Sequence, residues 1–265
     1  MAKVITVTSG KGGVGKTTST ANLGTALAML GHKVVVMDAD IGLRNLDVVM
    51  GLENRIVYDL VDVIEGNCRL RQALIKDKHQ SELYLLPAAQ TKDKDAVSQE
   101  EIIELVDQLR DEADFVLIDS PAGIESGFKN AIAGADEVII VTTPEVSAVR
   151  DADRIIGLCE AYDKGQPRLI VNRLRPKMVK NGEMMSVDDV LQILAIDLLG
   201  IIPEDEDVIT ATNKGEVLTL DKSSRTGRYY TDIARRLAGE EVPIEPIEDN
   251  PTLLERISGI FRGGR

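Results

Sequence analysis

The chain has 265 residues, of which 43% are hydrophobic and 28% charged, as expected for a globular protein with a sizeable core rather than a disordered chain. The formal net charge of −13 argues against nucleic-acid binding over the whole surface and leaves only a local basic patch open. No stretch reaches the ~18 apolar residues of a membrane-spanning helix, and the first residues show no secretory signal. We therefore expect a cytoplasmic protein whose two cysteines are ordinary thiols, because their spacing suits no metal site.

Short apolar runs alternate with helical patterns along the chain. The runs are rich in β-branched residues and apolar on both faces, which is typical of parallel strands covered on both sides. We predict strands at 4–8, 33–39, 83–88, 114–120, 137–143, 168–173 and 198–203. A 3.6-residue periodicity predicts helices at 17–30, 100–113, 147–162 and 186–195. The alternation predicts an α/β fold, a doubly wound and mostly parallel sheet, in one domain over residues 1–238.

The stretch GKGGVGKT, residues 10–17, lies between the first predicted strand and the first predicted helix. It satisfies the phosphate-loop pattern G-x-x-x-x-G-K-[ST], which arises by chance in about one chain in a hundred of this length. Glycines let the backbone wrap a phosphate with its N–H groups turned inward, at the positive end of a helix. We predict that Lys16 reaches the β- and γ-phosphates, that Thr17 holds Mg²⁺, and that Thr18 lies near the α-phosphate. The predicted nucleotide-binding residues here are Gly10, Lys11, Gly12, Gly13, Val14, Gly15, Lys16, Thr17 and Thr18.

Aspartates stand at the ends of two predicted strands. The run VVVMDAD ends in Asp38 and Asp40, and DFVLIDS contains Asp119. Because ligands of such sheets bind at the carboxyl ends of parallel strands, these carboxylates should lie beside the phosphate loop. We assign Asp119 to the water shell of Mg²⁺, Asp38 to support of the metal, and Asp40 to orienting the attacking water. The alternative is that each carboxylate only caps a turn or helix.

Lys11 is a second lysine in the loop, and KGGVGKTT resembles the deviant Walker A sequence of the ParA/MinD group of P-loop ATPases. Stretches at 38–66, 118–128 and 142–158 share the resemblance, which extends over nearly the whole chain. It implies that Lys11 reaches across a dimer interface to the partner's nucleotide, so that ATP holds a homodimer together. The catalytic residues would then be Lys11, Lys16 and Asp40, with ATP and Mg²⁺ as cofactors. A solvated lysine at the loop rim is the alternative.

The resemblance also implies an adenine site. Asn172 and Arg173 lie at the end of one late strand, and Pro203, Glu204 and Asp205 at the end of another. On the resemblance, Asn172 and the backbone from Pro203 to Asp205 hold the base, with Arg173 packed nearby. The sequence contains no N-K-x-D guanine motif, which favours ATP over GTP. Two plain strand-end turns are the alternative.

The C-terminal region differs from the rest in composition. Residues 239–250, GEEVPIEPIEDN, combine acids and prolines with little to bury, which predicts a flexible acidic linker. In residues 251–265 the apolar side chains fall within an arc of roughly 120°, the stripe of an amphipathic helix suited to a membrane interface. The predicted membrane contacts are Leu253, Leu254, Ile257, Ile260 and Phe261. Packing of this helix on its own domain is the alternative.

One such tail should bind a membrane only marginally. Burial of its apolar side chains is worth roughly 8–12 kcal/mol, and ordering about ten residues costs a similar amount. Two tails on an ATP-bound dimer would bind bivalently, and effective concentration can raise avidity by ~10²–10⁴. Dimerisation would then switch membrane binding.

The resemblance implies a cell-division role on the cytoplasmic face of the inner membrane. It implies an ATPase that dimerises on ATP, binds lipid, recruits the division inhibitor MinC for septum placement, and is stimulated by MinE. It also places Gly123 in a switch that senses the γ-phosphate and Glu145 near the dimer face. The alternating charges of residues 149–154 are either a partner-docking helix or an ordinary ion-paired surface.

Two other functions remain open, and a third is disfavoured by the positions of the cysteines. A ParA-like DNA or plasmid partition ATPase shares the loop but needs a basic DNA-binding surface, and here we expect no nucleic-acid partner. The nitrogenase iron protein needs cluster-ligating cysteines near its switches, and neither Cys68 nor Cys159 lies there. In a nucleotide-gated scaffold or filament, slow hydrolysis would merely reset assembly.

Overall fold

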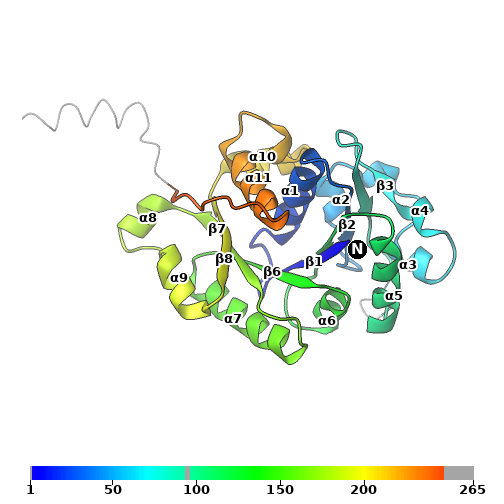
Figure 1. The fold of residues 1–265 in the computed structure, drawn as a ribbon, viewed down its shortest axis with the longest axis horizontal. Coiled ribbons are helices and arrows are strands. Elements are labelled where there is room, and N and C mark those ends of the chain that lie inside the picture. The colour runs from blue at the N-terminus through cyan, green and yellow to red at the C-terminus, as the bar shows by residue number, and fades with distance from the viewer. Residues whose placement is uncertain (1, 93–95, 248–265) are drawn as a thin grey trace, which may run out of the picture.

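The computed structural model describes residues 2–92 and 96–247. An 8-stranded sheet runs through the centre of the molecule in the order β3-β4-β2-β5-β1-β6-β7-β8, with helices on both faces (Figure 1). All neighbouring strands are parallel except β3 and β4. The predicted doubly wound, mostly parallel α/β sheet is therefore confirmed.

Every predicted strand is present, with ends that differ by at most two residues, whereas β3 was not predicted. The strands are β1 (Lys3–Thr8), β2 (Val34–Asp38), β3 (Ile75–Lys76), β4 (Leu83–Leu86), β5 (Phe115–Asp119), β6 (Glu137–Thr142), β7 (Arg168–Leu174) and β8 (Asp197–Pro203).

The four predicted helices correspond to α1, α5, α7 and α9, and the others are additional. The α-helices are α1 (Lys16–Met29), α2 (Leu46–Val49), α3 (Leu60–Ile64), α4 (Leu70–Ala73), α5 (Gln99–Arg110), α6 (Ser126–Ala133), α7 (Val146–Ala161), α8 (Pro176–Lys180), α9 (Val187–Leu194), α10 (Glu206–Asn213) and α11 (Arg225–Leu237). Two short 3-10 helices are η1 (Glu53–Arg55) and η2 (Leu218–Leu220).

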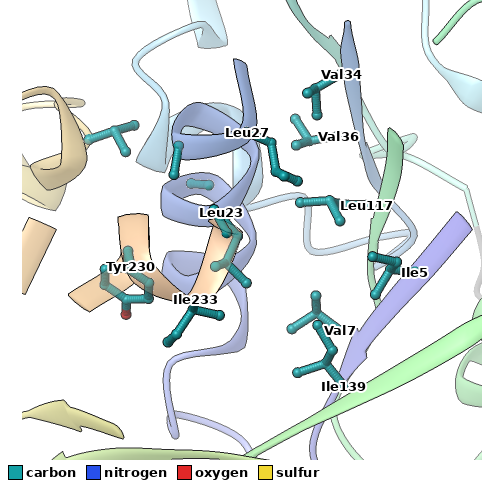
Figure 2. Close-up of a cluster of buried hydrophobic side chains, with 14 of the residues drawn as sticks. Ile5, Val7, Leu23, Leu27, Val34, Val36, Leu117, Ile139, Tyr230 and Ile233 are labelled. Carbon is teal, nitrogen blue, oxygen red and sulfur yellow. The ribbon is translucent and has the colours of Figure 1, made fainter. Parts of the chain in front are cut away.

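The core forms on both faces of the sheet because successive strand residues point to opposite sides. Ile5 and Val7 of β1 belong to the cluster under α1 and α11, whereas Val4 belongs to the cluster under α5. Figure 2 shows Leu27 of α1 directed at Val34 and Val36 of β2, and Leu23 belongs to the same cluster. Burial on both faces explains why the strand sequences are apolar throughout.

The topology brings the ends of several strands to one edge of the sheet. Because β1 lies between β5 and β6, the loop from β1 to α1 begins in the middle of this edge. The register between β2 and β5 places Asp38 beside Asp119. Residues that are far apart in the sequence thus meet where the phosphate loop begins.

The helix α11 is the last regular element of the described chain. Residues 239–247, the described part of the predicted linker, have no regular secondary structure. Within the described ranges, no helix is both long and apolar enough to cross a membrane. The amphipathic helix predicted for residues 251–265 lies outside the described residues and stays a prediction, as do its contacts Leu253, Leu254, Ile257, Ile260 and Phe261.

Candidate nucleotide-binding site

The loop between β1 and α1 depends on glycine. Gly13 and Gly15 have φ angles of 78° and 98°, which glycine adopts without steric cost. A Cβ on Gly13 would meet nothing within 4 Å, so the space beside this part of the loop is open. The helix α1 begins directly afterwards at Lys16, and its first-turn N–H groups have no partner within the helix. This arrangement suits an anion such as a phosphate.

The helix α7 packs directly against the start of the loop. A Cβ on Gly10 would lie 2.3 Å from the carbonyl oxygen of Asp151, so only glycine permits this approach. Lys11 Nζ donates to Ser147 Oγ at 3.2 Å and lies 3.9 Å from a carboxylate oxygen of Glu145. Such exposed contacts stabilise the folded state by at most about 1 kcal/mol. Lys11 can therefore leave them readily to bind an anion such as a phosphate.

Asp38 organises the loop that follows β2. One of its carboxylate oxygens accepts the N–H of Asp40 at 2.9 Å, and the other accepts those of Asn45 and Leu46 at 3.0 and 3.1 Å. Both oxygens are therefore engaged in shaping this loop, on which Asp40 lies. The predicted metal role of Asp38 would act through this positioning and stays a prediction.

Asp119 lies beside Asp38 and faces the start of α1. Its carboxylate accepts the Thr20 hydroxyl at 3.3 Å, and the Thr17 hydroxyl also hydrogen bonds to it. Burial raises the pKa of Asp119 to about 7, and the neighbouring charge of Asp38 adds to the effect, whereas Lys16 opposes it. Burial likewise raises the pKa of Asp38 to about 6.

These oxygen donors fit Mg²⁺. Two buried carboxylates with raised pKa values would be stabilised in their charged form by a divalent cation, and the Thr17 hydroxyl lies within reach of Asp119. In the described part of the chain, no group of three or more His, Cys, Asp and Glu side chains could hold a metal ion. A Mg²⁺ ion here would thus take most of its oxygen ligands from phosphate and water, as it prefers to do.

A small cavity of about 40 Å³ lies next to the loop. All five predicted adenine contacts line it together with Gly15 and Thr18, so residues from two separate strand ends do meet at the phosphate loop. The amide of Asn172 donates to the Val14 carbonyl at 2.8 Å and links the two parts of the site. The complete lining is Gly15, Thr18, Asn172, Arg173, Pro203, Glu204, Asp205, Val208, Ile209 and Tyr230.

Three lining residues were missed from the sequence. Val208 and Ile209 come from α10, and Tyr230 comes from α11, neither of which was predicted. Tyr230 is buried, with its hydroxyl 3.4 Å from Ser19 Oγ, and burial raises its pKa to about 12. The spacing of apolar residues in α11 could have revealed the helix but not its place beside the loop.

The segment after β5 hydrogen bonds to the two residues that lead into the phosphate loop. The N–H of Gly123 donates to the Ser9 carbonyl at 3.2 Å, and the φ angle of Gly123 is 97°. The Ser120 hydroxyl donates to that of Thr8 at 2.8 Å. These contacts connect the segment of Gly123 to the phosphate loop, and the switch role of Gly123 stays a prediction.

Comparisons with known proteins agree with this geometry. Residues 5–218 match the family model described as CobQ/CobB/MinD/ParA nucleotide binding domain. The septum site-determining protein MinD of Bacillus subtilis (strain 168) is 57% identical over 264 residues, which cover 98% of each chain.

Two solved structures resemble the chain over most of its length. A chain of the MinC:MinD cell division protein complex of Aquifex aeolicus is 50% identical, with a TM-score of 0.88, and the match covers 94% of this chain and 100% of that one. The septum site-determining protein MinD of Pyrococcus horikoshii OT3, complexed with Mg-ADP, is 29% identical, with a TM-score of 0.80 and coverage of 91% and 100%.

Proposed function

The chain belongs to the MinD branch of the CobQ/CobB/MinD/ParA family of nucleotide-binding proteins, and from that premise we propose that it is a Mg²⁺-dependent ATPase that regulates placement of the division septum. One observation carries the proposal: the phosphate loop, the buried carboxylates and the cavity lined by the predicted adenine contacts meet at one edge of the sheet. The Mg-ADP complex of the Pyrococcus relative supports the choice of nucleotide and metal.

Each residue of the site has a role in this proposal. The glycine loop and Lys16 bind the phosphates, and Thr18 and Asn172 line the adenine side. Bound Mg²⁺ supplies charge neutralisation of the phosphates, with Thr17 and Asp119 to hold it. Asp40 orients the attacking water, a task of positioning rather than full proton removal. Asp38 keeps the loop of Asp40 in place through its hydrogen bonds.

Dimerisation on ATP is proposed on the resemblance, and the position of Lys11 supports it. Its contacts with Ser147 and Glu145 are weak and exposed, so a phosphate group on a second copy can replace them. Each copy would then hold the nucleotide of the other. The hydrolysis of ATP would weaken this bond and separate the two copies.

Light scattering at fixed protein concentration tests the dimer. We expect a dimer for the Asp40→Ala variant in Mg-ATP and a monomer in Mg-ADP, because hydrolysis no longer removes the γ-phosphate. Adding Lys11→Ala should return the ATP sample to monomer. A monomer of the Asp40→Ala variant in saturating ATP would refute the proposed dimer.

Membrane binding is proposed for the tail on the resemblance and on the pattern of residues 251–265. Co-sedimentation with vesicles containing anionic lipid should require ATP and should disappear in a chain that ends at Asn250. ATP hydrolysis without vesicles should be unchanged by this truncation. Equal sedimentation with ADP would contradict a dimer-gated membrane switch while leaving the ATPase intact.

Recruitment of a division inhibitor is proposed from the Aquifex relative, which forms a complex with MinC. We expect MinC to co-sediment with vesicles only when this protein and ATP are both present. MinE would then raise the rate of ATP hydrolysis and release both proteins. The partition alternative is less well supported, given the net charge of −13 and the high identity to septum site-determining relatives.

A further inference from the structure

The first residues after α11 are bound to the domain. We define the strap as residues 240–245. Arg235 pairs with the carboxylate of Glu240 at 2.8 Å, and the Arg236 guanidinium donates to the carbonyls of Val242 and Pro243 at 2.8 and 2.7 Å. Figure 1 shows this segment in orange to red where it leaves the end of α11.

The strap also packs through alternate side chains. Val242 and Ile244 are half-buried, whereas Glu241, Pro243 and Glu245 are exposed, the period of an extended segment lying on a surface. A cavity of about 280 Å³ beside the strap is lined mainly by α11, by one residue of β8 and by the strap itself. Glu241 and Glu245 thus face solvent, whereas Val242 and Ile244 face the domain.

Arg236 connects the strap to the sheet as well as to α11. Its third hydrogen bond reaches the carbonyl of Leu199 in the edge strand β8, at 3.0 Å. The helix comes this close because position 200 is glycine: a Cβ on Gly200 would lie 2.4 Å from Ile233. One guanidinium therefore donates to three main-chain carbonyls, two in the strap and one in β8. The ammonium group of a lysine could not reproduce this planar arrangement of donors.

We propose that Arg236 is a positioning residue for the C-terminal tail, fixing the point at which the chain leaves the domain. The inference rests on the proposed membrane binding of residues 251–265. When the strap is bound, the free linker before the predicted helix is about five residues long, residues 246–250. When the strap is released, the free linker begins after α11 and is about twelve residues long. Effective concentration falls roughly as the −3/2 power of tether length, so releasing the strap should weaken bivalent binding about fourfold.

The test uses the full-length chain with the Arg236→Gln substitution. Arg71→Gln is the matched control, because it removes the same charge from an exposed arginine that pairs with Glu112 and does not contact the strap. A glutamate-specific protease should cleave after Glu240, Glu241 or Glu245 at least fivefold faster in Arg236→Gln and at the wild-type rate in Arg71→Gln. Unchanged cleavage in Arg236→Gln would overturn the anchoring.

Vesicle titration in Mg-ATP tests the tether. Arg236→Gln should bind vesicles about fourfold more weakly than the wild type, and Arg71→Gln should bind them as well as the wild type does. A second variant leaves Arg236 intact and inserts about seven Gly and Ser residues after Pro246; it should lose the same factor while its strap stays protected from the protease. Wild-type affinity in this insertion variant would overturn the tether argument, even if Arg236→Gln were impaired by altered folding.

The two readouts separate this inference from the proposed function. If the wild-type chain does not bind vesicles in ATP, the membrane proposal and the tether argument both fail, and the protease result still decides whether Arg236 anchors the strap. If the wild type binds vesicles and Arg236→Gln binds equally well despite a released strap, the proposed function stands and the inference about position is wrong.

Discussion

The buried pair of Asp38 and Asp119 makes the stability of the nucleotide-free protein depend on pH. Their pKa values of about 6 and about 7 exceed the ordinary value of about 3.9 for an unfolded chain. Between about pH 4 and pH 7 the folded state therefore holds more protons than the unfolded state. The free energy of unfolding should fall as pH rises through this range. Urea denaturation at pH 5 and pH 7.5 would measure the difference.

The Asp119→Asn variant isolates the contribution of this pair. The substitution removes one ionisable group and also removes a charge next to Asp38. The drop in the free energy of unfolding from pH 5 to pH 7.5 should therefore be smaller in the variant than in the wild type, by about 1 kcal/mol or more. Asp189→Asn is the control. Hydrogen bonds from Ser186 lower the pKa of Asp189, so this carboxyl group stays ionised between pH 5 and pH 7.5 and its removal should leave the pH dependence of stability unchanged. Parallel pH profiles for the wild type and Asp119→Asn would contradict the account.

A second residue-scale effect concerns the link between the phosphate loop and the cavity lined by the predicted adenine contacts. Asn172→Ala removes the hydrogen bond to Val14 and a polar group of the cavity, and should weaken ADP binding about tenfold. Calorimetric titration would measure this. Asn130→Ala loses a similar bond, to the Val97 carbonyl at 2.7 Å, away from the site. It should leave ADP affinity unchanged, and an equal loss in both variants would point to general destabilisation.

At the scale of elements, the contact between α7 and the phosphate loop depends on the absence of a side chain. Gly10→Ala would place a Cβ 2.3 Å from a main-chain oxygen of α7, so the loop or the helix must move, at about 1–3 kcal/mol. Gly12→Ala meets only the Ala122 side chain, at 3.9 Å, and should change stability by about 0.5 kcal/mol or less. Thermal denaturation without nucleotide would compare the stabilities of the two variants. Equal stabilities would contradict a tight contact between Gly10 and α7.

The elements also show what could be predicted from the sequence and why. Strands buried on both faces and long helices such as α1 and α7 carry strong local patterns, and the phosphate loop is itself a local motif. The antiparallel strand β3 has only two residues. The helices α6 and α10 are as short as α9, with eight residues each, but their apolar residues follow the helical period less clearly than those of α9. The place of Tyr230 in the cavity beside the phosphate loop depends on packing of α11 against α1, which no local pattern encodes.

For the whole molecule, an ATP-dependent dimer would couple unfolding to protein concentration. Binding of a second copy to the folded state stabilises it by mass action. We expect the Tm of the Asp40→Ala variant in Mg-ATP to rise by about 2 to 3 °C for each hundredfold increase in protein concentration. In Mg-ADP the Tm should not depend on protein concentration.

Adding Lys11→Ala to this variant separates nucleotide binding from dimerisation. Lys11 contacts α7 of its own chain through Ser147 and Glu145, whereas Lys16 lies at the start of α1, near Asp119. The double variant should therefore still gain stability from Mg-ATP, because its own phosphate loop is intact, but its Tm should no longer change with protein concentration. Loss of both effects would show that Lys11 serves the nucleotide of its own chain, and an equal concentration dependence in ADP would show that the γ-phosphate does not control the dimer.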